Sequence, residues 1–289
     1  MNRNSLFWIV ITSLIMTAAC SEKTVKAPTV PRVVLDHAFV VVDDLTYDAI
    51  AASEFLKTTF AASKVSAVQS GTGSSWTGAY FFGPETYIEI LRVSSVSDDQ
   101  PGTGGLGFVV ERRGELDQLE AVLRASVSAP INRQLMSLAD EGGKSEPNFY
   151  MLTLQYEGLG NVGFMEYHER IAEKYGGITR TAVHSKTHDS SKALGNIAVI
   201  KAALNEATTN AYKEVFAALN YAVSSNGQII ELRGPEQIIQ ISPATESSWG
   251  IQEIGFKLIN PPSRDIEEQI GTSRLVLRAD GNGVWVFGK

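Results

Sequence analysis

The sequence has little of what marks several common functional classes. Cys20 is the only cysteine among 289 residues, so no disulfide can form within the chain. There is no cluster of Lys and Arg, and the formal net charge is −7, which argues against a nucleic-acid surface. A nucleophile elbow, a phosphate-binding loop, a dinucleotide fingerprint and a His-Glu-x-x-His zinc motif are all missing. A small-molecule or protein partner is therefore expected.

The first 19 residues resemble a bacterial lipoprotein signal peptide. Arg3 gives a basic start, residues 6–16 are apolar, and small residues precede Cys20. The resemblance implies lipidation of Cys20 and a lipid-anchored membrane protein of the bacterial cell envelope, with residues 20–32 as a tether. The apolar run is shorter than the roughly 20 residues that a membrane-spanning helix needs, so an uncleaved anchor is the lesser alternative.

A Gly-Pro-Glu turn followed by a short strand occurs twice, at residues 83–91 and 234–241, which indicates an internal duplication. On the first of these strands, alternation places Glu89 on the same face as Tyr87 and Leu91, where a carboxylate needs a partner. Gln240 stands at the matching position of the second copy. One half is therefore expected to keep a site that the other half has lost.

The apolar pattern predicts repeated units of one strand, one helix and further strands. The first unit covers residues 33–93, with a helix to about residue 60, and the second covers 106–168, with a helix over 114–125. The pattern restarts at residue 194 and ends in strands over 254–287. We expect an α+β chain with domains at 33–168 and 192–289, joined by a connector at 169–191.

Paired strand-helix-strand-strand-strand modules with a histidine on the first strand and a glutamate on the last resemble the vicinal oxygen chelate (VOC) superfamily. This superfamily includes glyoxalases, bleomycin-resistance proteins and extradiol dioxygenases. The resemblance implies tandem βαβββ modules in two glyoxalase-like domains, the second one degenerate, with a divalent metal on inward residues of first and last strands. The motifs that carry it are Leu35-Asp36-His37-Ala38-Phe39-Val40 and Thr86-Tyr87-Ile88-Glu89.

The resemblance implies three metal ligands in this sequence, namely His37, Glu89 and Glu166. A mixed nitrogen and oxygen set suits Zn²⁺, Fe²⁺ or Mn²⁺. Glu89 or Glu166 would then also be the catalytic group that moves a proton. The fourth expected ligand is missing, because Leu106 or Gly107 stands in its place, depending on the register.

Four further residues are candidates for ligand binding. The aromatic rings are expected in the cavity wall, and the histidine shares a strand face with Glu166 and offers a second nitrogen. These residues are Trp76, Tyr80, Tyr150 and His168.

Structural interpretations remain open for the same side chains. The aromatic rings fit an ordinary core, and His37 fits a core histidine bonded to a backbone carbonyl. The two carboxylates fit ion pairs with Arg92, Arg133 or Lys201. The second half offers no ligand set, because its matching positions hold Asn196, Gln240 and Phe287.

Two kinds of function follow. The first is a membrane-anchored, metal-dependent lyase, isomerase or dioxygenase of the VOC type that acts on a small oxygen-rich molecule. The alternative is a non-catalytic small-molecule-binding or structural envelope lipoprotein. Metal analysis of the purified protein separates the first from the others.

Overall fold

The computed structural model describes residues 29–71, 73–96, 99–139, 144–154, 162–245 and 248–287. The predicted signal peptide, the predicted lipidation site Cys20 and most of the predicted tether lie outside these residues. Within the described part of the chain, no helix has the length and apolar character needed to cross a membrane.

The first half of the chain forms a mixed sheet of eight strands in the order β2-β3-β4-β1-β5-β8-β7-β6. β1 is parallel to β4, β5 is parallel to β8, and β1 and β5 are antiparallel neighbours, so two four-stranded modules lie side by side. The strands are β1 (Val33–Val42), β2 (Ala62–Gln69), β3 (Ser75–Phe82), β4 (Tyr87–Arg92), β5 (Gly104–Val110), β6 (Ile131–Ala139), β7 (Ser145–Leu154) and β8 (Val162–Tyr167).

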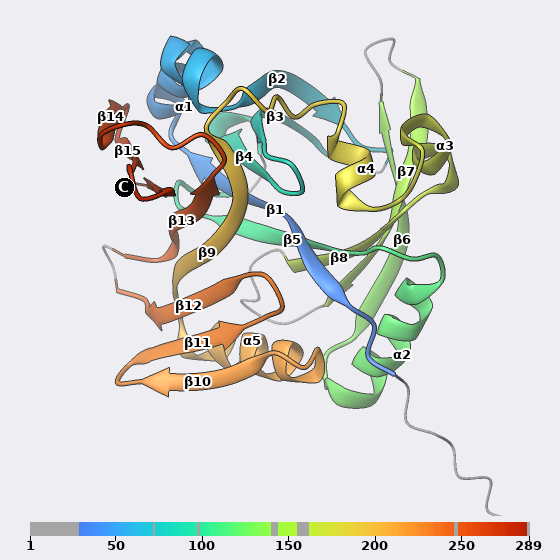
Figure 1. Ribbon diagram of the computed structural model, residues 1–289. Coiled ribbons are helices and arrows are strands. Elements are labelled where there is room, and N and C mark those ends of the chain that lie inside the picture. The colour runs from blue at the N-terminus through green and yellow to red at the C-terminus, as the bar shows by residue number, and fades with distance from the viewer. Residues whose placement is uncertain are drawn as a thin grey trace, which may run out of the picture.

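The second half repeats this arrangement in the order β10-β11-β12-β9-β13-β16-β15-β14. Its strands are β9 (Leu194–Leu204), β10 (Ala222–Asn226), β11 (Ile229–Arg233), β12 (Ile238–Pro243), β13 (Gly250–Leu258), β14 (Ile266–Ile270), β15 (Ser273–Leu277) and β16 (Asn282–Val286). Figure 1 shows the two sheets side by side. The predicted fold class, α+β with tandem glyoxalase-like modules, is confirmed.

Helices explain the strand directions. α1 (Asp44–Ala52), α2 (Glu115–Ser126) and α5 (Glu206–Ala218) each connect the first two strands of a module, so the first and last strands of these modules run parallel. Between β13 and β14 the described chain holds no helix. In this module the chain therefore enters the second strand without first running back along a helix, and the last strand, β16, is antiparallel to the first, β13.

Local signals set the helix starts more accurately than the ends. The Asp43 carboxylate caps α1 by accepting a hydrogen bond from the Thr46 N–H at 2.9 Å, as its position before the apolar pattern indicates. Helical structure reaches residue 60 as predicted, but not as one helix: α1 ends at Ala52, Ser53 interrupts it, and residues 56–60 form a separate π-helical turn.

Three strands escaped prediction from the apolar pattern, namely β6, β10 and β14, and each is at the edge of a sheet. These three strands bury few side chains on either face, so their sequences lack a clear apolar alternation. All five residues of β10 are exposed, β6 has no buried residue, and β14 has only one, Ile270.

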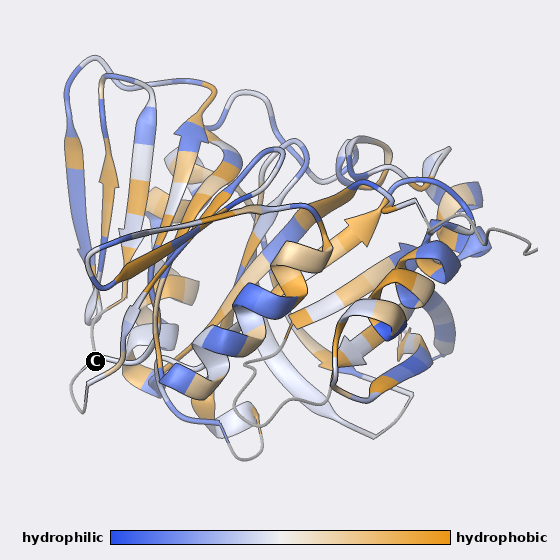
Figure 2. Ribbon diagram, turned by 90° about the horizontal axis from the view of Figure 1, so that it is seen from below, coloured by the Kyte–Doolittle hydropathy of each residue, from blue (hydrophilic) through white to orange (hydrophobic). Residues whose placement is uncertain are grey.

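The two halves share one hydrophobic core. The Phe60 ring lies 5.3 Å from Phe256 and 5.6 Å from Trp285, and Phe108 lies 5.3 Å from Phe216, measured between ring centroids. Figure 2 shows hydrophobic colour concentrated in the central strands of both sheets, whereas α5 carries hydrophilic residues on its outer side. The boundaries of two separate domains stay a prediction.

The first sheet curls until its edge strands meet. An isolated bridge joins Ser70 to Leu138, and the Gly71 N–H donates to the Ser137 carbonyl at 2.8 Å. The connector between the sheets forms α3 (Glu169–Tyr175) and α4 (Arg180–His184), which lie over one end of the curled sheet (Figure 1). The concave face of the first sheet is thus enclosed on several sides.

Candidate functional site

A β-bulge in β1 places two neighbouring side chains on the concave face. The pairing register between β1 and β5 shifts between Leu35 and His37. Leu35 therefore packs in the hydrophobic core, whereas Asp36 and His37 both line the cavity. Strict alternation along β1 would put Leu35 and His37 on one face, but the bulge adds one residue to the strand and separates them.

The concave face encloses a cavity of about 630 Å³, and a second space of about 390 Å³ adjoins it beside α4. This volume suits a small organic ligand. The walls combine aromatic, thioether and aliphatic side chains with many polar and ionisable ones. Both spaces are lined by His37, Trp76, Glu89, Phe149 and Met165.

The His37 ring is held between its two neighbouring strands. On the β4 side it stacks on Tyr87, with ring centroids 4.6 Å apart and planes 20° apart. On the β5 side, a Cβ added to Gly107 would lie only 2.1 Å from His37 Cε1, so the ring occupies the space that the glycine leaves. Nδ1 bonds to Asp36 at 2.9 Å, whereas Nε2 has no hydrogen bond to any described residue.

Asp36 is a buried carboxylate with three partners. Its Oδ2 pairs with His37 Nδ1, and its Oδ1 accepts from the Tyr167 hydroxyl at 2.7 Å and pairs with His184 Nε2 at 3.1 Å. Burial alone would raise the pKa of Asp36, but the charges and hydrogen bonds of the two histidines outweigh it and hold this pKa well below its ordinary range. Asp36 therefore stays ionised.

Glu89 is the second acidic group of the cavity and is 7% exposed. The indole N–H of Trp76 donates to Glu89 Oε1 at 2.9 Å, and the Tyr80 hydroxyl also bonds to this carboxyl. Burial raises the pKa of Glu89, although the His37 charge and these hydrogen bonds oppose the shift. Burial lowers the pKa of His37, but the hydrogen bond and charge of Asp36, together with the Glu89 charge, produce a net rise. His37 and Glu89 therefore influence each other's ionisation.

Glu166 does not join this pair. Its carboxylate accepts hydrogen bonds from the Gly114 N–H at 3.0 Å and the Leu116 N–H at 3.1 Å, at the start of α2. Met165, the preceding residue of β8, lines the cavity instead. The expected convergence of Glu166 with the other two residues is therefore wrong, because alternation identifies two faces of a strand without telling which one is concave.

The four candidate ligand-binding residues divide into two pairs. Trp76 and Tyr80 line the cavity, as expected. Tyr150 lies opposite Glu166 in the strand register and contacts the His168 ring at 5.5 Å, so both belong to the outer side of the sheet. His168 caps α3, where its Nδ1 accepts from the Arg170 N–H at 3.3 Å.

Sequence reasoning missed Asp36, Tyr167 and His184 as site residues. Asp36 stands directly before His37, but an unbulged strand would point it away from the cavity. His184 lies in a polar connector with no apolar period. Its contact with Asp36 joins residues 148 positions apart, which no local pattern could reveal.

In the second sheet, Val199 and Gln240 stand at the positions of His37 and Glu89. Glu89 pairs with Phe39 across β4 and β1, whereas Gln240 pairs with Lys201 across β12 and β9. By the same register Val199 corresponds to His37, so the expected match of Asn196 is wrong. Asn196 instead bonds to the backbone N–H and carboxylate of Glu85.

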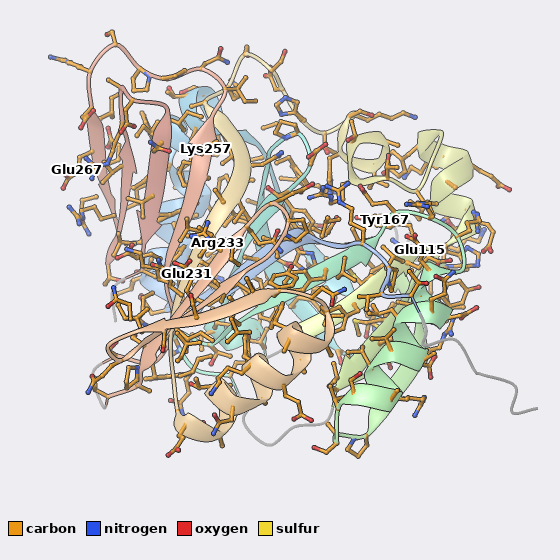
Figure 3. All side chains as sticks on the ribbon, turned by 60° about the horizontal axis from the view of Figure 1, so that its bottom comes forward. Glu115, Tyr167, Glu231, Arg233, Lys257 and Glu267 are labelled. Atoms are coloured by element: carbon orange, nitrogen blue, oxygen red, sulfur yellow. The ribbon has the colours of Figure 1, made fainter. Side chains whose placement is uncertain are left out.

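Ion pairs occupy the corresponding region of the second sheet. Lys201 Nζ lies 2.7 Å from Glu253, and Arg233 lies 2.6 Å from Glu231. Gln240 donates to Glu231 at 3.2 Å. Figure 3 shows Glu231 and Arg233 on the second half of the molecule, away from Tyr167 in the first.

The fold defines the class of this protein, an α+β protein of tandem glyoxalase-like modules. Residues 35–287 match the model of a family described as a family of unknown function, DUF5829, and the chain belongs to this family. No curated protein matches the sequence.

Solved structures support the fold alone. A hypothetical protein from Staphylococcus aureus is similar over 82% of this chain and 96% of that chain, with a TM-score of 0.56 and 10% identity. A mutant 4-hydroxymandelate synthase from Streptomyces coelicolor covers 77% of this chain and 70% of its own, with a TM-score of 0.43 and 13% identity. A catechol 2,3-dioxygenase covers 78% and 70%, with a TM-score of 0.40 and 14% identity. Similarities at such low identity do not assign a function to this chain.

The residues present do not fit the divalent metal that the VOC resemblance implies. The inward positions on β1, β4, β5 and β8 hold His37, Glu89, Gly107 and Met165. Of these four, only His37 and Glu89 offer nitrogen or oxygen, and a catalytic zinc site ordinarily has three protein ligands. Asp36 also lines the cavity, but its two oxygens already bond to His37, Tyr167 and His184. Across the described ranges, no group of three or more His, Cys, Asp or Glu side chains is placed to hold a metal ion.

Proposed function

We propose that this protein binds a small molecule in the cavity of the first sheet and places an oxygen of that molecule against His37 and Glu89. The observation that supports this proposal is a pair of ionisable groups, His37 and Glu89, that influence each other's pKa in a cavity with aromatic walls. The matching positions of the second sheet hold no such pair. Buried polar groups at a few points of an apolar pocket are typical of ligand sites.

The pair also suits proton transfer. Charged His37 can donate a proton from Nε2 to a ligand oxygen, and ionised Glu89 can accept one from a neighbouring carbon or hydroxyl. Such a transfer isomerises a carbonyl compound or eliminates a leaving group. An isomerase or lyase is thus the catalytic form of the proposal, and binding without reaction is its simpler form.

Two aromatic probes of equal shape test the proposal. 2-Naphthol carries the oxygen that His37 and Glu89 would recognise, and naphthalene lacks it. With the purified full-length chain, we expect 2-naphthol to quench tryptophan fluorescence through Trp76 and to raise the unfolding temperature. A charged hydrogen bond contributes about 1.5–3 kcal/mol, so His37→Leu should weaken 2-naphthol binding about tenfold or more and leave naphthalene binding unchanged.

His168→Gln is the matched control, because His168 lies on the outer side of the same sheet. It should bind both probes as the wild type does. Equal affinity of the wild type for the two probes, or equal loss of 2-naphthol binding in both histidine variants, contradicts the proposal.

The metal-dependent alternative has a separate test. With two protein donors, we expect no stoichiometric Zn²⁺, Fe²⁺ or Mn²⁺ in the purified chain. Retention of one metal ion per chain, together with its loss in Glu89→Gln, would restore the metal-dependent enzyme.

We further propose that a lipid on Cys20 holds the protein at the membrane of a bacterial cell envelope, on the support of the signal-like first 19 residues. Wild type should separate with membranes and carry a lipid. A soluble wild-type protein without lipid contradicts this proposal.

A further inference from the structure

We infer that His184, on the connector helix α4, is a positioning residue of the cavity site: it holds Asp36 so that Asp36 fixes the ring orientation and the proton-bearing nitrogen of His37. The inference rests on the proposed function, in which His37 Nε2 meets the ligand. It brings the connector, which carried no motif, into the site.

The two oxygens of Asp36 have different hydrogen-bond partners. Oδ1 pairs with His184 Nε2 at 3.1 Å and accepts from the Tyr167 hydroxyl at 2.7 Å. Oδ2 is then left to His37 Nδ1 at 2.9 Å. An ionised carboxylate only accepts hydrogen bonds, so Nδ1 of His37 carries a proton and Nε2 faces the ligand.

The position of His184 is itself fixed by the duplicated turns. Arg180 lies one helical turn earlier on α4, is 2% exposed, and donates to the Leu35 carbonyl at 2.8 Å, next to the bulge. Its guanidinium also lies 2.8 Å from Glu236 and 3.6 Å from Glu85, the glutamates of the two Gly-Pro-Glu turns. Both halves of the duplication therefore hold the helix that carries His184.

Other ionisable groups near His37 have defined states. Burial raises the pKa values of Tyr80, Tyr87 and Tyr167, which keeps these hydroxyls neutral. The charged groups that shift the pKa of His37 are Asp36 on β1 and Glu89 on β4, and His184 of α4 acts on Asp36. Replacing His184 should therefore change the pKa of His37 through Asp36.

If His184 only filled space, its replacement by another aromatic ring would not change the pKa of His37. His184 also contacts the Tyr87 ring at 5.5 Å and the Phe82 ring at 6.4 Å between centroids. His184→Phe keeps an aromatic ring at these contacts and removes the bond to Asp36. His184→Gln retains a hydrogen-bond donor without the aromatic ring. The two variants separate packing from hydrogen bonding.

The experiment follows the four histidines of the full-length chain by side-chain ¹⁵N NMR over a pH series without ligand. In His184→Phe, the Asp36 carboxylate no longer has two histidine partners and interacts with His37 alone. The His37 titration midpoint should therefore rise by about 1 pH unit. His184→Gln should give a smaller rise, and His168→Gln should give none. Binding of 2-naphthol to His184→Phe should change at least severalfold, since Nε2 is displaced or differently charged.

An unchanged His37 midpoint and unchanged ¹⁵N shifts in His184→Phe overturn the inference. If that variant does not fold, the same result in His184→Gln overturns it. Because these spectra need no ligand, a wild type that fails to bind 2-naphthol would contradict the proposed function and leave this inference standing.

Discussion

Gly107→Ala tests the geometry of the site with a single methyl group. The added Cβ would lie 2.1 Å from Cε1, 2.5 Å from Nδ1 and 2.6 Å from Nε2 of His37. The ring cannot retreat toward β4, because Tyr87 already stacks on it at 4.6 Å. It must therefore turn away and give up its bond to Asp36. We expect a loss of about 1–3 kcal/mol in the free energy of unfolding, as overpacked interiors show.

Gly163→Ala is a matched control for this change. Gly163 is the register partner of Gly107 on β8 and lines the same cavity. Its added Cβ would meet only the Met151 sulfur at 3.2 Å and Cγ at 3.6 Å, in a flexible side chain. We expect a cost below about 1 kcal/mol, because thioether side chains adapt to small changes in packing.

Urea unfolding and 2-naphthol binding together measure the outcome. Gly107→Ala should lose stability and bind 2-naphthol about tenfold or more weakly, whereas Gly163→Ala should stay close to wild type in both. If Gly107→Ala unfolds and binds as the wild type does, the His37 ring does not occupy the space over this glycine and the reasoning is refuted.

Three further predictions concern other parts of the molecule. Arg180→Met removes a buried cation from the partly exposed carboxylates of Glu85, Glu111 and Glu236 and should cost about 1.5–3 kcal/mol in urea unfolding. The exposed Arg274→Met should cost less than about 1 kcal/mol, and equal costs would show that the Arg180 cluster contributes no more than an exposed ion pair. Glu166→Gln weakens the cap of α2 and should cost about 1 kcal/mol without changing the metal content of the purified chain, and a fall in metal content would return Glu166 to the site. Glu89→Gln should be more stable than wild type at pH 7: a carboxyl whose folded pKa is raised contributes stability that is present below its ordinary pKa of 4.5 and is lost as pH rises through the folded value. Urea midpoints of the two proteins should converge near pH 4, and a gap that persists or reverses would contradict the burial effect on Glu89.

Much of the fold could be read from local pattern. Strand and helix periods predicted the repeated modules, because a buried face needs apolar residues at the period of its element. The Gly-Pro-Glu turns at 83–91 and 234–241 predicted the duplication. The same periods failed at the edge strands β6, β10 and β14, whose exposed faces impose no apolar alternation.

The candidate site was predictable only in part. His37 and Glu89 stood out as polar exceptions on apolar strands, and both line the cavity. Glu166 met the same criterion and lies on the other face, where it caps α2. A buried carboxylate needs compensation, but backbone N–H groups of a helix supply it as well as a metal would.

By itself the sequence determined the elements, their repetition and the lone polar side chains that a folded chain must satisfy. The tertiary structure alone decided that a bulge turns Asp36 toward the cavity, that His184 reaches it from the connector, and that Met165 replaces Glu166 on the concave face. The physical reason is the distance along the sequence between the residues that interact. Periodicity records the neighbours of a residue within one element, whereas the concave side of a sheet and the contacts of a connector arise from packing between segments more than a hundred residues apart.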